Sequence, residues 1–134
     1  MKLSSKTITA IKMFIDLGEQ YENGFISLKD IAQRKDLSKK FLEQIMPSYK
    51  NAGLLLGNRG NQGGYKLAKS PNQISLKDII YIQENSLAKE LVNYASIDSA
   101  IEKADELLDD YFSKISLAKL IEDQRESYLN DYSI

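Results

Sequence analysis

Residues 38–67 hold two secondary-structure patterns in direct succession, SKKFLEQIMPSYKNAGLLLGNRGNQGGYKL. The first predicts an amphipathic helix that begins after Ser38, a residue suited to capping a helix N-terminus. Its apolar side consists of Phe41, Leu42, Ile45 and Met46. Pro47 is expected to break or kink this helix before residues 49–52, because proline has no amide hydrogen to donate. Gly53 suits the position just after the helix.

The second pattern is a pair of short strands with a glycine-rich loop between them. Residues 54–56 and 65–67 have strand composition, and residues 57–64 contain four of the seven glycines of the chain. This arrangement predicts a β-hairpin, called the wing below, with Arg59 near its tip. The alternative is a loose hairpin in which Arg59 is only solvated.

A shorter helix is predicted just before this segment, from the phrase Ile26-Ser27-Leu28-Lys29-Asp30-Ile31. The Ser27 hydroxyl can accept a hydrogen bond from the amide of Asp30, and the Asp30 carboxylate can accept one from the amide of Ser27. We therefore expect a helix from Ser27 to about Arg34. Two short helices with a tight connection resemble a helix-turn-helix.

The same phrase returns twice later in the chain. Ile74-Ser75-Leu76-Lys77-Asp78-Ile79 repeats it in full, and Ile115-Ser116-Leu117-Ala118-Lys119-Leu120 repeats it without the returning carboxylate. Because their spacings differ, we interpret the three phrases as separate helix starts rather than as repeats. Another helix is predicted over residues 7–17, capped by Ser4 or Ser5.

Composition excludes several classes of function. The 134 residues suit one domain, or one domain plus an oligomerisation arm. The absence of Cys and His removes thiolate nucleophiles, cysteine-ligated metal sites and the commonest general base. No nucleophile–base pair or phosphate-binding motif is present, so we do not expect an enzyme. With no apolar run long enough for a membrane span and no signal-peptide pattern, we expect a cytoplasmic protein without a cofactor.

The net charge of -1 hides a division along the chain. Residues 1–70 carry 12 basic and 6 acidic residues, a balance of +6, whereas residues 71–134 carry 6 basic and 13 acidic residues, a balance of -7. Phosphate binding depends on local potential rather than on net charge, so a basic nucleic-acid-binding half is possible. The alternative is two solvated surfaces that differ by chance.

A long acidic helix is predicted in the last third of the chain. Its apolar residues recur at alternating spacings of four and three, and they are Ile97, Ile101, Ala104, Leu108, Tyr111 and Ile115. This spacing is typical of a helix that pairs with another helix. We expect the matching helix of a second subunit in a symmetric homodimer. Packing against its own domain is the alternative.

Five motifs occur in a fixed order, namely MKLSSK at 1–6, SLKDIA at 27–32, FLEQI at 41–45, AGL at 52–54 and RGNQGGY at 59–65. Together they resemble the Rrf2 family of bacterial transcriptional regulators, densely over residues 1–83 and again over residues 100–121. The resemblance implies a mainly α fold with a small β-hairpin. It places a winged helix-turn-helix DNA-binding domain at residues 1–83, and a linker, a long C-terminal dimerisation helix and a tail at residues 84–134. It also implies sequence-specific operator binding, with repression favoured.

By this resemblance, the helix that begins after Ser38 reads the DNA major groove. The candidate DNA-binding residues are Ser38, Lys39, Lys40, Phe41, Glu43, Gln44, Lys50, Arg59, Gly60 and Gln62. The lysines can reach phosphates or guanine, Glu43 can accept from cytosine, and Gln44 can pair with adenine or pack internally. Arg59 is the best single candidate, because a narrow minor groove attracts a guanidinium.

The sequence departs from the best-known members of the family at one segment. Those members carry three cysteines that hold an Fe–S cluster before the dimerisation helix, whereas the matching residues 84–96 contain none. The chain thus resembles the cluster-free members, of which one subgroup controls cysteine and sulfur metabolism with cysteine synthase as partner. By that resemblance, Ile134 is expected to dock in the amino-acid site of cysteine synthase. The alternative function is a protein-interaction module that binds such a partner through Ile134.

Overall fold

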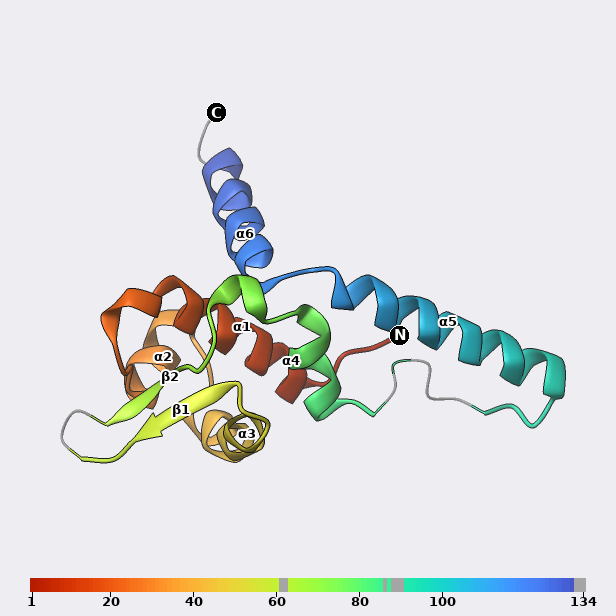
Figure 1. Cartoon of the computed structure of the whole chain (residues 1–134), viewed down its shortest axis with the longest axis horizontal. Coiled ribbons are helices and arrows are strands. Elements are labelled where there is room, and N and C mark those ends of the chain that lie inside the picture. Colours follow the sequence, from red (N-terminus) through yellow and green to blue (C-terminus); the bar gives the residue numbers. More distant parts are fainter. Residues whose placement is uncertain (61–62, 86, 88–90, 132–134) are drawn as a thin grey trace.

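The computed structural model describes residues 1–60, 63–85, 87 and 91–131. Figure 1 shows a helical body with a two-stranded hairpin at one side and two longer helices that leave it in different directions. In chain order the elements are α1 (Ser5–Glu19), η1 (Tyr21–Asn23), α2 (Leu28–Lys35), α3 (Lys39–Asn51), β1 (Leu55–Asn58), β2 (Gly64–Leu67), η2 (Pro71–Gln73), α4 (Leu76–Gln83), α5 (Ala95–Ser113) and α6 (Leu117–Asp131). This architecture confirms the predicted mainly α fold with a small β-hairpin.

Helix α1 lies at the centre of the body. The Ser4 hydroxyl caps it by accepting a hydrogen bond from the amide of Thr7 at 3.2 Å, which confirms the predicted start. The helix contacts α2, α3, α4 and α6. Its fully buried apolar side consists of Ala10, Met13, Phe14 and Leu17. Because α1 is the common support, the positions of α2 and α3 are set by how each packs on it.

The core joins α1, α3 and α4 at one aromatic contact. Phe14 and Tyr49 are both 0% exposed, and their ring centroids lie 5.0 Å apart in an edge-on arrangement. The Tyr49 hydroxyl donates a hydrogen bond to the carbonyl oxygen of Ile79 in α4 at 2.6 Å. Burial raises the pKa of this hydroxyl, so it stays protonated and continues to donate. This contact fixes the orientation of α3 relative to its two neighbours.

Helix α3 runs without interruption through Pro47, so the predicted break there is wrong. Pro47 lies on the exposed side of the helix, where water can replace the missing hydrogen bond. Buried side chains on both sides of Pro47 anchor the helix in the core, namely Leu42, Ile45, Met46 and Tyr49. The other two predictions are confirmed, because the Ser38 hydroxyl accepts from the amide of Phe41 at 3.2 Å and Gly53 follows the helix with φ of 78°.

A bidentate ion pair fixes α2 against α1. The carboxylate of Asp16, whose side chain is only 1% exposed, accepts from Nε and Nη2 of Arg34 at 2.7 and 3.1 Å. The hydrogen bond to Asp16 raises the pKa of the Arg34 guanidinium above its usual value. Two parallel hydrogen bonds define an orientation as well as a distance. The pair therefore positions the end of α2, from which the chain turns into α3.

The wing is an antiparallel pair in which Leu55 lies opposite Leu67 and Asn58 lies opposite Gly64. The strands differ from the predicted residues 54–56 and 65–67, because pairing begins one residue later and continues to Asn58. The loop expected over residues 57–64 is correspondingly shorter. The prediction of two strands joined by a glycine-rich connection is confirmed.

All three Ile-Ser-Leu phrases begin a helix, as predicted. The hydroxyls of Ser27, Ser75 and Ser116 accept from the amide three residues later at 3.1, 3.0 and 3.0 Å. The returning hydrogen bond forms at Ser75, whose amide donates to Asp78 at 2.9 Å. The corresponding bond expected between Ser27 and Asp30 is absent. There the backbone of β2 lies against the Ser27 amide.

The phrases also form backbone pairs that local patterns do not reveal. Residues 74–76 and 115–117 lie antiparallel and exchange two hydrogen bonds, of 2.8 and 2.7 Å. Ile26 pairs in the same way with Tyr65 of β2, at 2.9 and 2.8 Å. The first pair fastens the connection between α5 and α6 to the start of α4, and the second fastens the wing to the start of α2.

Helices α5 and α6 pack on different parts of the body. Helix α5 lies on α4 through a second hydrophobic cluster, whose buried members are Leu76, Ile80, Leu87 and Phe112. Helix α6 lies on α1, where a Cβ added to Gly18 would be 2.4 Å from Ile121. Leu117, at the start of α6, is 0% exposed in the main core. The predicted domain boundary at residue 83 stays a prediction.

Candidate nucleic-acid interface

The exposed side of α3 carries most of the residues predicted to read DNA. Side chains three and four positions apart share one side of a helix, so Lys40, Glu43 and Gln44 form one face, with Lys39 beside it. All four are exposed, and Gln44 does not pack internally. Ser38 is exposed at the helix start, where its hydroxyl proton remains available to a phosphate.

The exposed face of α3 extends further than predicted. Ser48 and Asn51 are also exposed and follow Gln44 at spacings of four and three. Sequence reasoning missed them because the helix was expected to break at Pro47, although the spacing itself was visible. Phe41 is half-buried, which leaves only part of its ring available to a base.

The tip of the wing begins directly after β1 with the exposed side chain of Arg59. Gly60 follows with φ of 114°, in a region that side chains other than glycine rarely adopt. The amide of Gly63 donates to the carbonyl oxygen of Gly60 at 2.9 Å and closes the turn. Gln62, also predicted to contact DNA, lies outside the described residues.

Lys50 brings the last turn of α3 next to the wing. A Cβ added to Gly57 in β1 would lie 3.4 Å from Nζ of Lys50. A further basic residue, Lys66 in β2, lies with Nζ 4.6 Å from the ring centroid of Phe25. No local pattern predicts this cation–π contact, because the two residues are far apart along the chain.

The charges on this surface are not neutralised within the described part of the chain. None of the ion pairs found there includes Lys39, Lys40, Lys50 or Arg59. In contrast, acidic residues of α5 and α6 pair with lysines at Lys77–Asp109, Lys114–Asp110 and Lys119–Asp123. The positive charge of α3 and the wing is therefore available to an external anion such as the DNA backbone.

The apolar residues predicted for a dimer interface divide between two environments. Ile97, Ala104 and Tyr111 are exposed. Ile101, Leu108 and Ile115 are half-buried, and the last two pack on the second cluster. Ile115 lies beyond the end of α5, in the segment paired with residues 74–76.

A neighbouring stripe of α5 is more open. It consists of Ile97, Ala100, Ala104, Leu107 and Tyr111, again at spacings of three and four. Ile97, Leu107 and Tyr111 are 44%, 59% and 61% exposed. The structure thus adds Ala100 and Leu107 to the candidate interface. Periodicity alone could not separate this stripe from the adjoining one that packs on α4.

The donor chemistry of residues 84–96 does not fit an Fe–S cluster. The chain contains no Cys and no His, and cluster irons are held by these ligands. Glu84, at the start of the segment, is 2% exposed and accepts from the amide of Ser4 and the hydroxyl of Thr7 at 3.1 and 2.9 Å. Within the described ranges, no group of three or more acidic side chains is placed to hold a metal ion.

A search of the described helices for membrane-spanning segments finds none that is both long and apolar enough to cross a bilayer.

Comparison with known proteins identifies one family. The model of the family described as "Rrf2: Iron-dependent Transcriptional regulator" matches residues 3–123. The HTH-type transcriptional regulator CymR of Bacillus subtilis is 39% identical over 88 residues, which are 66% of this chain and 64% of that protein. The chain spans about three fifths of the length of the curated relatives it matches, for example 59% and 64% of two of them.

Solved structures agree over a larger share of the chain. IscR from T. potens superposes with a TM-score of 0.81 at 33% identity, over 95% of this chain and 90% of that chain. CymR, described as the global cysteine regulator of B. subtilis, superposes with a TM-score of 0.78 at 30% identity, over 91% of this chain and 97% of that chain. The helical body, the wing and the long helix therefore recur together in these proteins.

Proposed function

Since this chain belongs to the Rrf2 family of transcriptional regulators, we propose that it binds a specific DNA operator as a homodimer and represses transcription without an Fe–S cluster. The observation that carries the proposal is the continuous exposed surface formed by α3 and the wing. Its basic residues Lys39, Lys40, Lys50 and Arg59 have no ionic partner within the described residues. Such a surface supplies both phosphate contacts and side chains that read base edges.

The arrangement suggests a division of labour on the DNA. Glu43 and Gln44 lie on the exposed face of α3, where they can meet base edges in the major groove. Lys39 and Lys50 lie nearer the two ends of the helix and are suited to the flanking phosphates. Arg59, at the wing tip, is suited to the adjacent minor groove. We propose that these three contacts together define one half-site.

Arg59→Ala is the direct test of the wing contact. We expect specific operator binding to weaken by about 1–3 kcal/mol, because one cation is lost from the interface. For the same reason, the slope of the logarithm of the binding constant against the logarithm of the salt concentration should fall in magnitude by about one. Fluorescence anisotropy with operator DNA at several salt concentrations measures both. Lys103→Ala is the matched control, because Lys103 is an exposed cation of α5, with 69% of its side chain accessible. Equal affinities for Arg59→Ala and the unmodified protein would contradict the wing assignment.

The dimer proposal is supported by the exposed apolar stripe of α5. Isolated apolar side chains are common on protein surfaces, but a stripe with helical spacing is typical of a surface that pairs with another helix. To bind one operator, the twofold axis of this helix pair must place both copies of α3 on the same DNA. The proposal then implies two half-sites about one helical turn apart, or a multiple of that distance.

We further propose that the protein controls genes of cysteine or sulfur metabolism. It is supported by similarity to the regulator described as the global cysteine regulator of B. subtilis, and by a composition that cannot ligate a cluster. We propose cysteine synthase as the partner that brings the signal, with Ile134 as the contact residue. Ile134 lies outside the described residues, so this proposal rests on the family resemblance.

Removing Ser133 and Ile134 tests the partner proposal. We expect the truncated chain to lose at least about tenfold in affinity for cysteine synthase, because the contact with the amino-acid site would be absent. Biolayer interferometry with the purified enzyme measures it. Tyr128→Ala serves as a control for general effects of change near the end of α6. An unchanged complex after truncation would exclude Ile134 as the docking residue and would leave the protein-interaction alternative without its contact.

A further inference from the structure

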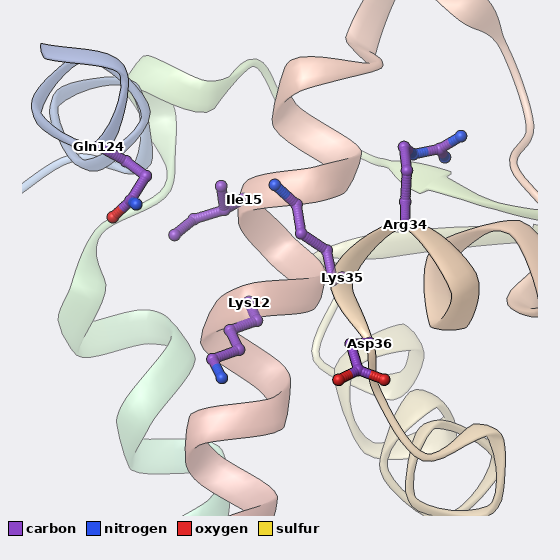
Figure 2. A pocket seen from close by; sticks show the side chains of 6 residues that line it. All are labelled: Lys12, Ile15, Arg34, Lys35, Asp36 and Gln124. Carbon is purple, nitrogen blue, oxygen red and sulfur yellow. The ribbon is translucent and has the colours of Figure 1, made fainter. Parts of the chain in front are cut away.

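A cavity of about 340 Å³ lies where α1, the end of α2 and α6 come together, and none of its lining residues belongs to α3 or the wing. Its lining residues are Lys12, Ile15, Arg34, Lys35, Asp36 and Gln124. Figure 2 shows that Lys12 and Ile15 come from α1 and that Gln124 comes from α6. The other lining residues, Arg34, Lys35 and Asp36, lie at the end of α2 and directly after it. The volume lies at the lower end of the range for small-molecule sites in proteins.

Charge in this cavity is unequally neutralised. Arg34 is engaged by the buried carboxylate of Asp16, and Nζ of Lys35 lies 2.6 Å from Glu19. Lys12 has no ionic partner among the described residues. Lys12 is therefore the one cation of the lining without an ionic partner, and only the rim carboxylate of Asp36, which forms no ion pair among the described residues, offsets its charge. The other two cations contribute donors that are already partly satisfied. This balance suits a ligand with one acidic group rather than a polyanion.

The remaining lining residues define the rest of the ligand. The amide of Gln124 can both donate and accept a hydrogen bond, and Ile15 offers an apolar wall. The exposed carboxylate of Asp36 repels additional negative charge at the rim. Together these groups favour a small, partly polar metabolite that carries a single carboxylate or phosphate group.

The cavity lies between α6 and the connection that leads from α2 into α3. Figure 1 shows α1 between α6 and α3, and none of the residues that line the cavity belongs to α3, the helix proposed to read DNA. Asp36 belongs to the connection between α2 and α3, and its backbone has a left-handed φ of 52°. Only Leu37 separates it from Ser38, which caps α3. A bound molecule would thus touch both α6 and the segment that leads into α3.

We propose that this cavity binds a small metabolite with one carboxylate or phosphate group, and that its occupancy changes the affinity of the protein for operator DNA. Lys12 supplies the main charge contact, and Gln124 holds the ligand against α6. The effect on DNA requires two arrangements of α2 and α3, one that binds DNA and one that does not. The ligand must bind these two arrangements with different affinities. The second half of the proposal rests on the proposed function, whereas the binding site itself does not.

The binding site is tested with the full chain and three small probes at constant ionic strength. Acetate and inorganic phosphate represent the two acidic groups, and acetamide is the neutral control for acetate. In amide-resolved NMR titrations we expect saturable shifts at Lys12, Ile15, Asp36 and Gln124 with one or both anions and none with acetamide. The stronger of the two anions identifies the acidic group. Shifts spread evenly over the lysines of the whole surface would overturn the site.

A matched pair of variants separates this site from general charge effects. Lys12→Gln is expected to weaken binding of the anion about tenfold, because it removes the main charge contact. Lys103→Gln removes an exposed lysine of α5 and should bind the anion as the unmodified protein does. Both positions are exposed, so neither change disturbs the core. Equal anion binding by the two variants would overturn the role of Lys12.

Operator binding with and without the anion tests the coupling. We expect the anion to change operator affinity at least about fivefold in the unmodified protein and not in Lys12→Gln, whose affinity without the anion should be normal. Anion binding at the cavity with no operator binding at low salt would refute the proposed function and leave the site standing. Normal operator binding without NMR shifts at the cavity residues would refute the binding site and leave the proposed function standing. Anion binding that leaves operator affinity unchanged would refute the coupling.

Discussion

Leu107→Glu is expected to separate the dimer and to lower operator affinity at least about a hundredfold, a loss of about 2.7 kcal/mol, while the monomer remains folded. Leu107 is 59% exposed within one chain, so a carboxylate there stays hydrated in the monomer. In a paired helix interface the same carboxylate would be buried without a partner, which is strongly unfavourable. Loss of the dimer removes the simultaneous contact with two half-sites, and with it the gain in effective concentration.

Sedimentation velocity gives the oligomeric state of this variant, and anisotropy with a two-half-site operator gives its affinity. Ser99→Glu is the matched control, because Ser99 is exposed on α5 outside the apolar stripe and the change adds the same charge. The control should remain a dimer and keep normal affinity. A dimeric Leu107→Glu protein would place the interface elsewhere on the chain. In that case Ile101 and Leu108, on the adjoining stripe, would need to be tested next.

Gly64→Ala is expected to lower the free energy of unfolding by about 2–4 kcal/mol and to detach the wing from α2. A Cβ at this position would lie 2.2 Å from the carbonyl oxygen of Ile26 and 2.4 Å from its carbon, both of them backbone atoms that cannot rotate away. The clash falls next to the two hydrogen bonds that join Ile26 to Tyr65. Relief therefore requires that the wing move as a unit.

Urea denaturation gives the stability loss, and hydrogen exchange of the Tyr65 amide shows whether the wing has detached. Gly57→Ala is the control within the same hairpin. Its added Cβ would meet side-chain atoms of Tyr65 and Lys50 at 3.3 and 3.4 Å, and these can adjust. We expect this control to cost less than about 1 kcal/mol. Similar losses in the two variants would show that glycine is needed for chain flexibility in the wing rather than for close approach.

Local signals in the sequence were sufficient for the helix starts. A serine directly before an amphipathic run can cap the helix with its own hydroxyl, so Ser27, Ser38, Ser75 and Ser116 could each be identified without tertiary information. The wing was also visible, because its glycines are concentrated between two short apolar runs. The register of the two strands was not visible, because no local pattern shows that Asn58 pairs with Gly64.

The errors came from packing between distant segments. Pro47 lacks a hydrogen bond in every sequence context, yet burial of the neighbouring side chains keeps α3 continuous. At Ser27, whose amide lies beside the wing backbone, the returning bond from Asp30 does not form. On α5, the predicted pattern combined Ile97, Ala104 and Tyr111 of the open stripe with residues such as Leu108 of the stripe that packs on α4. Only the position of α4 shows which side each residue faces.

The candidate cavity had no signal in the sequence at all. Lys12, Asp36 and Gln124 are contributed by three segments that are far apart along the chain, and each alone reads as an ordinary surface residue. Their proximity follows from the packing of α2 and α6 on α1. Sites assembled in this way become visible only when the tertiary structure is known.

The antiparallel pairing of residues 74–76 with 115–117 has a consequence for divergence among related regulators. The two hydrogen bonds are made by main-chain atoms, so no change of side chain removes their donors or acceptors, apart from proline. The anchor of the connection that follows α5 therefore does not depend on the identity of its side chains, whereas the packing of α5 on α4 does. In the proposed dimer, this anchor would be inherited with the backbone, while base preference would vary with α3. Operator spacing would then be conserved more strongly than operator sequence.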